Sequence, residues 1–133
     1  MTHAPRTTLR IVTYNIHRSR GMDRRTRPAR VAEVLRHIDA DVIALQEVIG
    51  AGPSGGSHIE EIGAALGMGW VMAPTRQLRG QQFGNVVLSR FPVTLHNQHD
   101  LTYKACEERC MQRVDIDVNG HPLHVYNVHL GTA

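Results

Sequence analysis

The chain has 133 residues, of which 41% are hydrophobic and 20% are charged, and its net charge at pH 7 is +3. This length allows one domain, and the charged fraction is too low for a disordered chain. The mild positive charge suits an anionic partner such as a phosphate ester, although it does not require nucleic acid.

The termini and the cysteines give expectations about the compartment. No apolar run is long enough for a membrane-spanning helix, and residues 1–6 contain no apolar stretch of the signal-peptide type. We therefore expect a cytoplasmic protein without a transmembrane segment. On a strand that rises ~3.3 Å per residue, Cys106 and Cys110 would lie about 13 Å apart, which is too far for a disulfide, so we expect free thiols.

The first third of the chain predicts a strand, a helix and a second strand. Residues 9–17 are rich in β-branched residues and predict a strand. Pro28 suits the first turn of a helix, which we expect to end near Asp39. The apolar residues of this helix recur with helical spacing at Val31, Val34, Leu35 and Ile38. The apolar run within residues 41–48 predicts a strand buried on both faces, so the unit is βαβ with parallel strands.

The rest of the chain predicts one more helix and a β meander. The expected elements are a flexible loop at 50–57, a helix at 59–66 ended by Gly67, a short strand at 70–72, a basic loop at 74–82, and strands at 83–91, 93–101, 111–118 and 123–130. Asn119-Gly120 is a strong hairpin signal between the last two strands. We see no internal repeat and no linker that would divide residues 1–133 into two domains.

Three polar residues fall at the ends of predicted strands. Asn15, Glu47 and His129 would meet if these strands end at one edge, which is where ligands bind in open α/β sheets. Glu47 would supply an oxygen to Mg²⁺, which binds through one or two carboxylates plus substrate phosphate. Asn15 and His129 would hydrogen-bond the phosphate or the attacking water. The alternative is that the three residues are, respectively, a turn former, the start of a solvated loop and an incidental histidine.

Four sequence elements occur in the order TYNIH, ADVIALQEV, FGNVVLSRFPV and VYNVHLGTA. Together they resemble the endonuclease/exonuclease/phosphatase superfamily. The superfamily includes deoxyribonucleases, abasic-site endonucleases, neutral sphingomyelinases and inositol-phosphate phosphatases. The resemblance implies that Asn15 is an active-site and metal-site asparagine and that Glu47 is the principal ligand of Mg²⁺ or Mn²⁺. It also implies that His129 contacts the scissile phosphate. Arg109 matches an arginine that related sequences carry ahead of the penultimate strand, and it is a further candidate contact to substrate phosphate.

The resemblance also implies a fold and a missing part. The fold is α/β (α+β), a four-layer α/β-sandwich in which a mixed β-sheet is flanked by helices, and this chain would be its N-terminal half. Elements of the GDFN and SDH type, which carry further catalytic residues in the family, are absent from residues 1–133. We therefore expect a domain truncated before its C-terminal half, with one sheet lacking its counterpart. Such an open sheet would favour a homodimer. Because further catalytic residues are missing, we expect the chain to be weakly active or inactive alone.

The leading functional hypothesis is metal-dependent hydrolysis of a phosphate ester in a nucleic acid, a phospholipid headgroup or a small molecule. His17, Arg76 and Arg79 are candidate contacts to substrate phosphate, since arginine matches phosphate geometry, although a solvated loop would also explain the arginines. A non-catalytic α/β module that associates through its open sheet is the alternative. A nucleic-acid-binding domain ranks last, because only 5% of the residues are aromatic.

Overall fold

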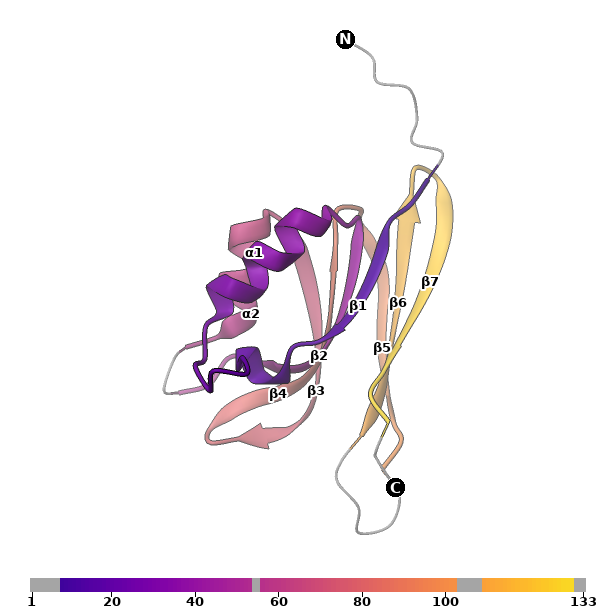
Figure 1. The fold of residues 1–133 in the computed structure, drawn as a ribbon. Coiled ribbons are helices and arrows are strands. Elements are labelled where there is room, and N and C mark those ends of the chain that lie inside the picture. The colour runs from indigo at the N-terminus through magenta and orange to yellow at the C-terminus, as the bar shows by residue number, and fades with distance from the viewer. Residues whose placement is uncertain (1–7, 54–55, 103–108, 131–133) are drawn as a thin grey trace.

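The computed structural model describes residues 8–53, 56–102 and 109–130. Two β-sheets pack face to face, and two helices cover the outer face of the larger sheet (Figure 1). The strand orders are β1-β2-β4-β3 in the larger sheet and β5-β6-β7 in the smaller one. The expected α/β sandwich is therefore confirmed.

The strands and helices follow the chain in a simple order. The elements are β1 (Ile11–Asn15), η1 (His17–Ser19), α1 (Pro28–Ile38), β2 (Val42–Ile49), α2 (His58–Leu66), β3 (Gly69–Leu78), β4 (Gln81–Ser89), β5 (Val93–Asp100), β6 (Cys110–Val118) and β7 (His121–Val128). β1 and β2 pair in parallel, as the predicted βαβ unit requires, and all the other pairs are antiparallel.

Local sequence explains where the helices begin and end. Pro28 occupies the first turn of α1, and Asp39 ends the helix in a left-handed conformation. Ser57 caps α2 by accepting a hydrogen bond from the backbone N–H of Glu60, and Gly67 ends it at a φ of +64°. No helix in the described part of the chain is long and apolar enough to cross a bilayer.

Alternating side chains of β2 contribute to two separate cores. Ile43 and Leu45 pack under α1 and α2, whereas Val42 faces the smaller sheet, where it packs with Val114 and Ile116. This double burial explains the continuous apolar run of β2. Val34, placed on the apolar stripe of α1 by its spacing, remains 42% exposed.

The predicted basic loop at 74–82 is wrong. β3 continues through Leu78 and forms a hairpin with β4 around Arg79 and Gly80. A bulge after Pro74 interrupts the alternation, and a proline is tolerated there because β3 is an edge strand. The first strand is also shorter than predicted: it ends at Asn15, and His17 begins a tight turn.

The expectation of a sheet without a counterpart is also wrong, because the chain supplies strands to both sheets. The outer face of β6 carries charged residues, and Arg113 of β6 and His124 of the neighbouring β7 both bond Asp115. The outer face of the smaller sheet therefore combines charged side chains with apolar ones such as Tyr126, which is 54% exposed. The larger sheet is one strand wider, and Ile11 on its edge strand β1 stays 50% exposed.

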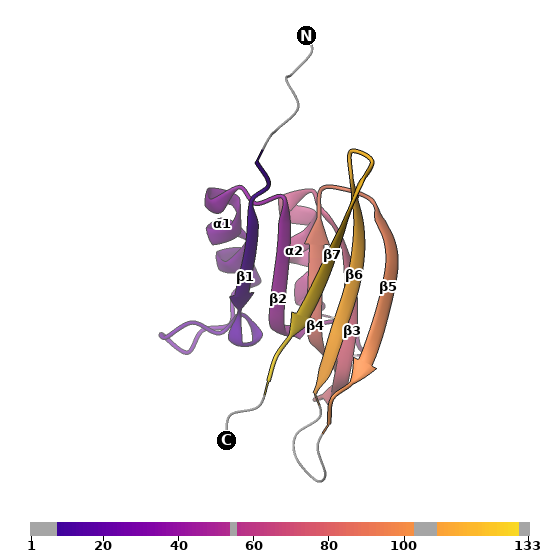
Figure 2. The same cartoon turned by 90° about the vertical axis from the view of Figure 1, so that its right-hand side faces the viewer.

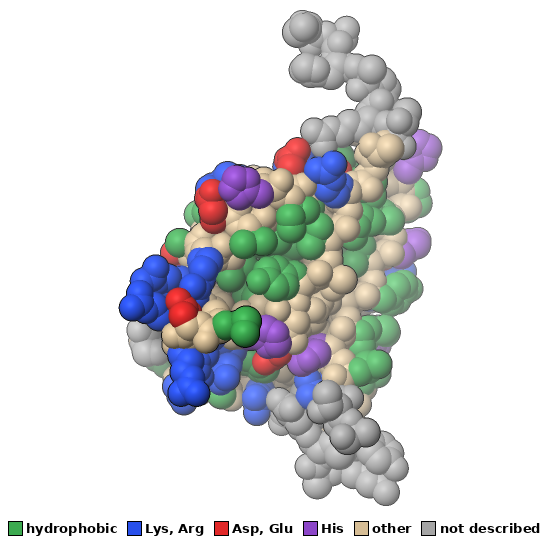
Figure 3. Space-filling view, viewed as in Figure 1, with side chains coloured by type: hydrophobic (Ala, Val, Ile, Leu, Met, Phe, Trp, Pro, Cys, Tyr) green, Lys and Arg blue, Asp and Glu red, His purple; other side chains and the backbone are tan. Residues whose placement is uncertain are grey.

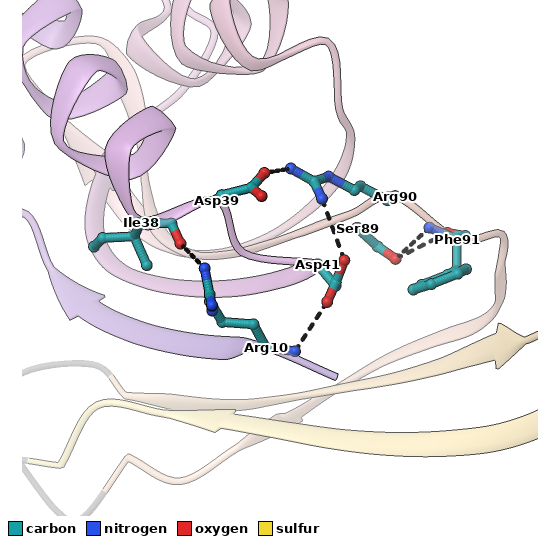
Figure 4. Close-up of polar contacts among 7 residues, drawn as sticks. All are labelled: Arg10, Ile38, Asp39, Asp41, Ser89, Arg90 and Phe91. Atoms are coloured by element: carbon teal, nitrogen blue, oxygen red, sulfur yellow. Dashed lines mark hydrogen bonds and ion pairs between the residues drawn. The ribbon is translucent and has the colours of Figure 1, made fainter. Parts of the chain in front are cut away.

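A polar cluster closes the end of the larger sheet where β1 and β2 begin (Figure 4). Asp41 is 3% exposed and accepts hydrogen bonds from the backbone N–H of Arg10 at 2.9 Å and from Nη1 of Arg90 at 3.2 Å. Arg90 also pairs with Asp39, and this bond is the main cause of its raised pKa. The cluster links the start of β1, the start of β2 and the end of β4.

The cysteine expectation is confirmed where the structure describes it. Cys110 is buried and its thiol is free, and burial raises the pKa of that thiol. Cys106 lies outside the described residues.

Candidate active site

The three strand-end residues come together at one end of the sandwich. β1, β2 and β7 all point toward this end (Figure 2). Asn15 is the last residue of β1, and its Nδ2 lies 3.4 Å from Nε2 of His129, which directly follows β7. His129 also lines a small cavity together with Glu47 and Arg109. Residues 114 apart in sequence therefore share one site.

A β-bulge turns Glu47 toward this site. Between the pairs Leu45–Val86 and Val48–Gly84, β2 has two residues where β4 has only Asn85. Strict alternation from Leu45 would point the side chain of residue 47 toward the helices. The extra residue, with a φ of +55° at Glu47, lets this side chain line the cavity between the sheets instead. The side chain is 23% exposed and so remains accessible.

Hydrogen bonding fixes which atoms of Asn15 and His129 are donors. Nη1 of Arg109 lies 2.8 Å from Nδ1 of His129, and because a guanidinium can only donate, Nδ1 accepts and the ring proton sits on Nε2. Oδ1 of Asn15 accepts the backbone N–H of His17 at 3.0 Å, which leaves its Nδ2 as a donor. Two N–H donors therefore face each other across 3.4 Å, an arrangement that suits an anionic oxygen bound by both.

His17 lies at the mouth of the site. Its Nδ1 is 3.4 Å from Oε2 of Glu47, and its side chain is 69% exposed. The predicted proximity of His17 to the strand-end residues thus agrees with the geometry, although His17 belongs to η1 and not to the strand.

The structure does not bring Arg76 and Arg79 into the site. The guanidinium of Arg76 stacks over the ring of Phe83, 5.0 Å from its centroid. Phe83 is among the residues that line the cavity of the site, whereas Arg76 is not. Arg79 lies at the β3–β4 turn and lines a different cavity, together with Arg18.

A buried network of amides supports the site from behind, and our sequence interpretation missed it. Nδ2 of Asn127 donates to the carbonyl oxygens of Leu45 and Val86 and to Oε1 of Gln112, at 3.0–3.1 Å. Oδ1 of Asn127 accepts from Nε2 of Gln46 at 2.8 Å. Since Gln46 precedes Glu47 and Asn127 lies two residues before His129, the network holds both sheets at the site in register.

Along β2 the apolar core residues change from odd-numbered to even-numbered positions, and this change could have revealed part of the arrangement. Ile43 and Leu45 are odd-numbered members of the helix-side core, but the next member on β2 is Val48. Such a change from odd to even positions indicates an inserted residue at 46 or 47, which is the bulge.

The described residues offer part of a coordination shell for a hard metal ion. Glu47 provides a carboxylate and Asn15 an amide, and the described ranges contain no group of three or more His, Cys, Asp or Glu residues that could hold a metal. One carboxylate with waters and a substrate phosphate is a set that Mg²⁺ accepts. The donors present therefore fit a magnesium ion that shares its shell with the substrate.

Comparison with known proteins identifies relatives that are longer than this chain. The chain is 27% identical to the uncharacterized protein YbhP of Escherichia coli (strain K12), in an alignment that covers 92% of this chain and 53% of that protein. It thus spans about half the length of the curated relatives it matches.

Solved structures share the fold. An endonuclease/exonuclease/phosphatase from Beutenbergia cavernae superposes with a TM-score of 0.75 at 28% identity, over 93% of this chain and 38% of that one. A D. rerio TDP2 complexed with a single strand DNA product superposes with a TM-score of 0.70 at 16% identity, over 94% and 47%. The sequence model of the Endonuclease/Exonuclease/phosphatase family matches residues 12–129. This chain therefore belongs to the endonuclease/exonuclease/phosphatase family.

Proposed function

We propose that this chain carries the metal-binding and phosphate-binding part of a divalent-metal-dependent phosphoric ester hydrolase. Enzymes of the family generally depend on a divalent metal ion and act on phosphate esters. The single observation that carries the proposal is the pair of N–H donors on Asn15 and His129, which share a site with the carboxylate of Glu47. Donors for an anion beside a ligand for a cation suit a metal-bound phosphate.

Each residue has a defined role in this proposal, and Asn15 has two, because its amide nitrogen donates to the phosphate and its amide oxygen binds the metal ion. Nδ2–H of Asn15 and Nε2–H of His129 bind a non-bridging oxygen of the scissile phosphate. Arg109 holds the histidine ring in the tautomer that donates from Nε2. Glu47 and the amide of Asn15 hold Mg²⁺ or Mn²⁺, which when bound stabilises negative charge on the phosphoryl group. His17 contacts Glu47 and helps to orient its carboxylate.

The substrate is proposed to be a phosphate ester, whether in a nucleic acid, a phospholipid headgroup or a small molecule. The TDP2 neighbour holds a single strand DNA product, which supports keeping nucleic acid among these classes. We expect the 133-residue chain by itself to hydrolyse such esters poorly. Hydrolysis requires a positioned base that deprotonates water, and the GDFN and SDH elements that carry further catalytic residues in the family are absent from residues 1–133. The loss of such a base typically costs ~10²–10⁴ in rate.

Calorimetric titration with Mg²⁺ and Mn²⁺ tests the metal site. Glu47→Gln should weaken binding at least tenfold, because the amide lacks the negative charge. The matched control Glu60→Gln, on the exposed side of α2, should bind as the wild type does. Equal binding by the wild type and Glu47→Gln would contradict the proposal. Hydrolysis of bis-p-nitrophenyl phosphate and plasmid DNA in Mg²⁺ measures the activity, and fast turnover that survives Glu47→Gln would also contradict it.

A further inference from the structure

A second cavity, of about 320 Å³, lies beside the candidate active site and is lined by four arginines. Arg18, Arg20 and Arg24 come from the segment between β1 and α1, and Arg79 comes from the β3–β4 turn. Figure 3 shows basic side chains gathered on this flank of the molecule. Arg79 is far in sequence from the other three, yet all four surround one space, which we call the arginine pocket.

The arginine pocket has positive charge without a matching negative one. No carboxylate belongs to the described residues that line it, and within the described ranges the four guanidinium groups form no ion pair. Asp23, in the same segment, instead makes a bidentate bond with Arg30, which holds its pKa down at about 2. Four like charges around one cavity favour an anion with several oxygens, and guanidinium groups bind phosphate with matching geometry.

The backbone is strained at three of the four arginines. Arg18, Arg24 and Arg79 have φ values of +58°, +63° and +50°, a region that favours glycine. Residues with side chains persist in such conformations where the surrounding structure holds them, and these positions gather at functional sites. Arginine at three left-handed positions around one cavity therefore points to a use for the charge.

The segment that carries three of the arginines is held in one shape. Ser19 is buried, and its Oγ lies 3.1 Å from Nδ1 of His58, which also lines the pocket. The backbone N–H of Arg27 donates to the carbonyl oxygen of Ser19 at 2.9 Å, and Arg20 pairs with Thr26 in a β-bridge. A preorganised segment lowers the entropic cost of binding a ligand.

The arginine pocket and the candidate active site are adjacent along two segments of the chain, η1 and β2. His17, which contacts Glu47, is followed directly by Arg18. On β2, Ile49 of the pocket is two residues beyond Glu47, which is ~7 Å at ~3.3 Å per residue. One small molecule can therefore reach both.

We propose that the arginine pocket binds a second phosphate group of the substrate while the scissile phosphate lies between Asn15 and His129. The substrate class is then an ester with at least two phosphate groups. This inference rests on the proposed function, because that function places the scissile phosphate between Asn15 and His129. The pocket itself does not depend on metal, so binding there is measurable without turnover.

The first experiment asks whether the pocket takes phosphate at all. The metal-free chain is titrated with inorganic phosphate while the ring signals of His58 are followed by NMR. The signals should shift in the wild type and in Arg25→Gln, a control in the same segment that does not line the pocket. In the double variant Arg24→Gln/Arg79→Gln the shift should be lost, and in Arg24→Lys/Arg79→Lys it should be partly retained. If the His58 signals of the wild type do not move, the proposal that the arginine pocket binds phosphate is overturned.

The second experiment asks whether that phosphate belongs to the substrate. A nucleoside 3′,5′-bisphosphate and the matching 5′-monophosphate are titrated into the chain in Mg²⁺. The bisphosphate should bind at least tenfold more tightly, and Arg24→Gln/Arg79→Gln should remove this preference, whereas His129→Ala should weaken both ligands. A preference that survives the double variant, or no preference at all, overturns the second-phosphate assignment.

The two proposals fail separately. If inorganic phosphate shifts His58 but the bisphosphate has no advantage, the pocket binds a free anion and the substrate assignment is overturned. If the pocket responds but Glu47→Gln leaves metal binding unchanged, the proposed function fails while the pocket stands.

Discussion

At the scale of single residues, Glu47 is a candidate metal ligand whose backbone adopts an unfavourable conformation. Its φ of +55° is in the left-handed region, where an L-residue costs about 1–2 kcal/mol relative to the right-handed one. This strain accompanies the bulge that directs the carboxylate into the cavity. Such strain at a ligand position is consistent with function.

The strain makes a prediction for two substitutions that both remove the carboxylate. Glu47→Gly should be more stable than Glu47→Ala by roughly 1 kcal/mol, since glycine adopts a positive φ freely and the gain exceeds its larger entropy loss on folding. Urea unfolding of both variants measures the difference. Equal midpoints, or a more stable Glu47→Ala, would show that the left-handed conformation is not strained in the folded chain.

Sequence reasoning predicted some residues of the candidate site but not others. Asn15, Glu47 and His129 were identified because strand ends and family wording both point to them. Gln46 and Asn127 were missed because each looks like an ordinary strand residue until its partner is known, and the partner is 81 residues away on the other sheet. Hydrogen bonds of this kind depend on how the two sheets are superposed, which no local pattern encodes.

At the scale of elements, β4 passes between two bulged strands. Gly84 pairs with Val48, just after the bulge of β2, and with Pro74, just before the bulge of β3. A Cβ added at Gly84 would lie 2.3 Å from the carbonyl oxygen of Ala73 and 2.8 Å from Cα of Pro74. The close approach of β3 thus leaves room only for glycine.

This packing predicts the effect of one methyl group. Gly84→Ala should lower the free energy of unfolding by about 2–3 kcal/mol, because the obstructing atoms are backbone and cannot rotate away. Gly69→Ala is the control: Gly69 begins β3, its added Cβ would have no neighbour within 4 Å, and its effect should stay within about 0.5 kcal/mol. Thermal unfolding measures both, and similar losses at the two sites would contradict the prediction.

The elements themselves were predicted where one signal dominates. Helix α1 follows from its proline and apolar stripe, and the β6–β7 hairpin follows from Asn119-Gly120. The β3–β4 hairpin was mistaken for a loop because Pro74 and the adjacent bulge disrupt alternation in a basic segment. Tertiary pairing with β4 stabilises that strand despite its weak local signal.

At the scale of the whole molecule, the two sheets cover each other and leave an edge exposed. β1 is an edge strand of the larger sheet, and Ile11 on it is 50% exposed. Edge strands offer unpaired backbone groups to other chains. The predicted homodimer would therefore form along this edge and not through an open sheet face.

Sedimentation across a range of protein concentrations tests this association. We expect a concentration-dependent dimer that Ile11→Lys weakens, since a charged side chain blunts edge pairing. Val34→Lys, at a site on α1 that is 42% exposed, should leave the dimer unchanged. A monomer at every concentration, or an equal effect of the two substitutions, would contradict dimer formation along β1.

The amide network between the sheets also has a consequence for folding. Gln46 belongs to the early βαβ unit, and Asn127 to the last strand of the chain. Contacts between segments so distant in sequence form slowly, because a long loop must close before they can stabilise anything. A partly folded chain can therefore contain Glu47 on its strand before His129 has arrived. We therefore expect the candidate site to be completed late in folding, so that the donor pair of Asn15 and His129 reports whether a molecule has reached its native state.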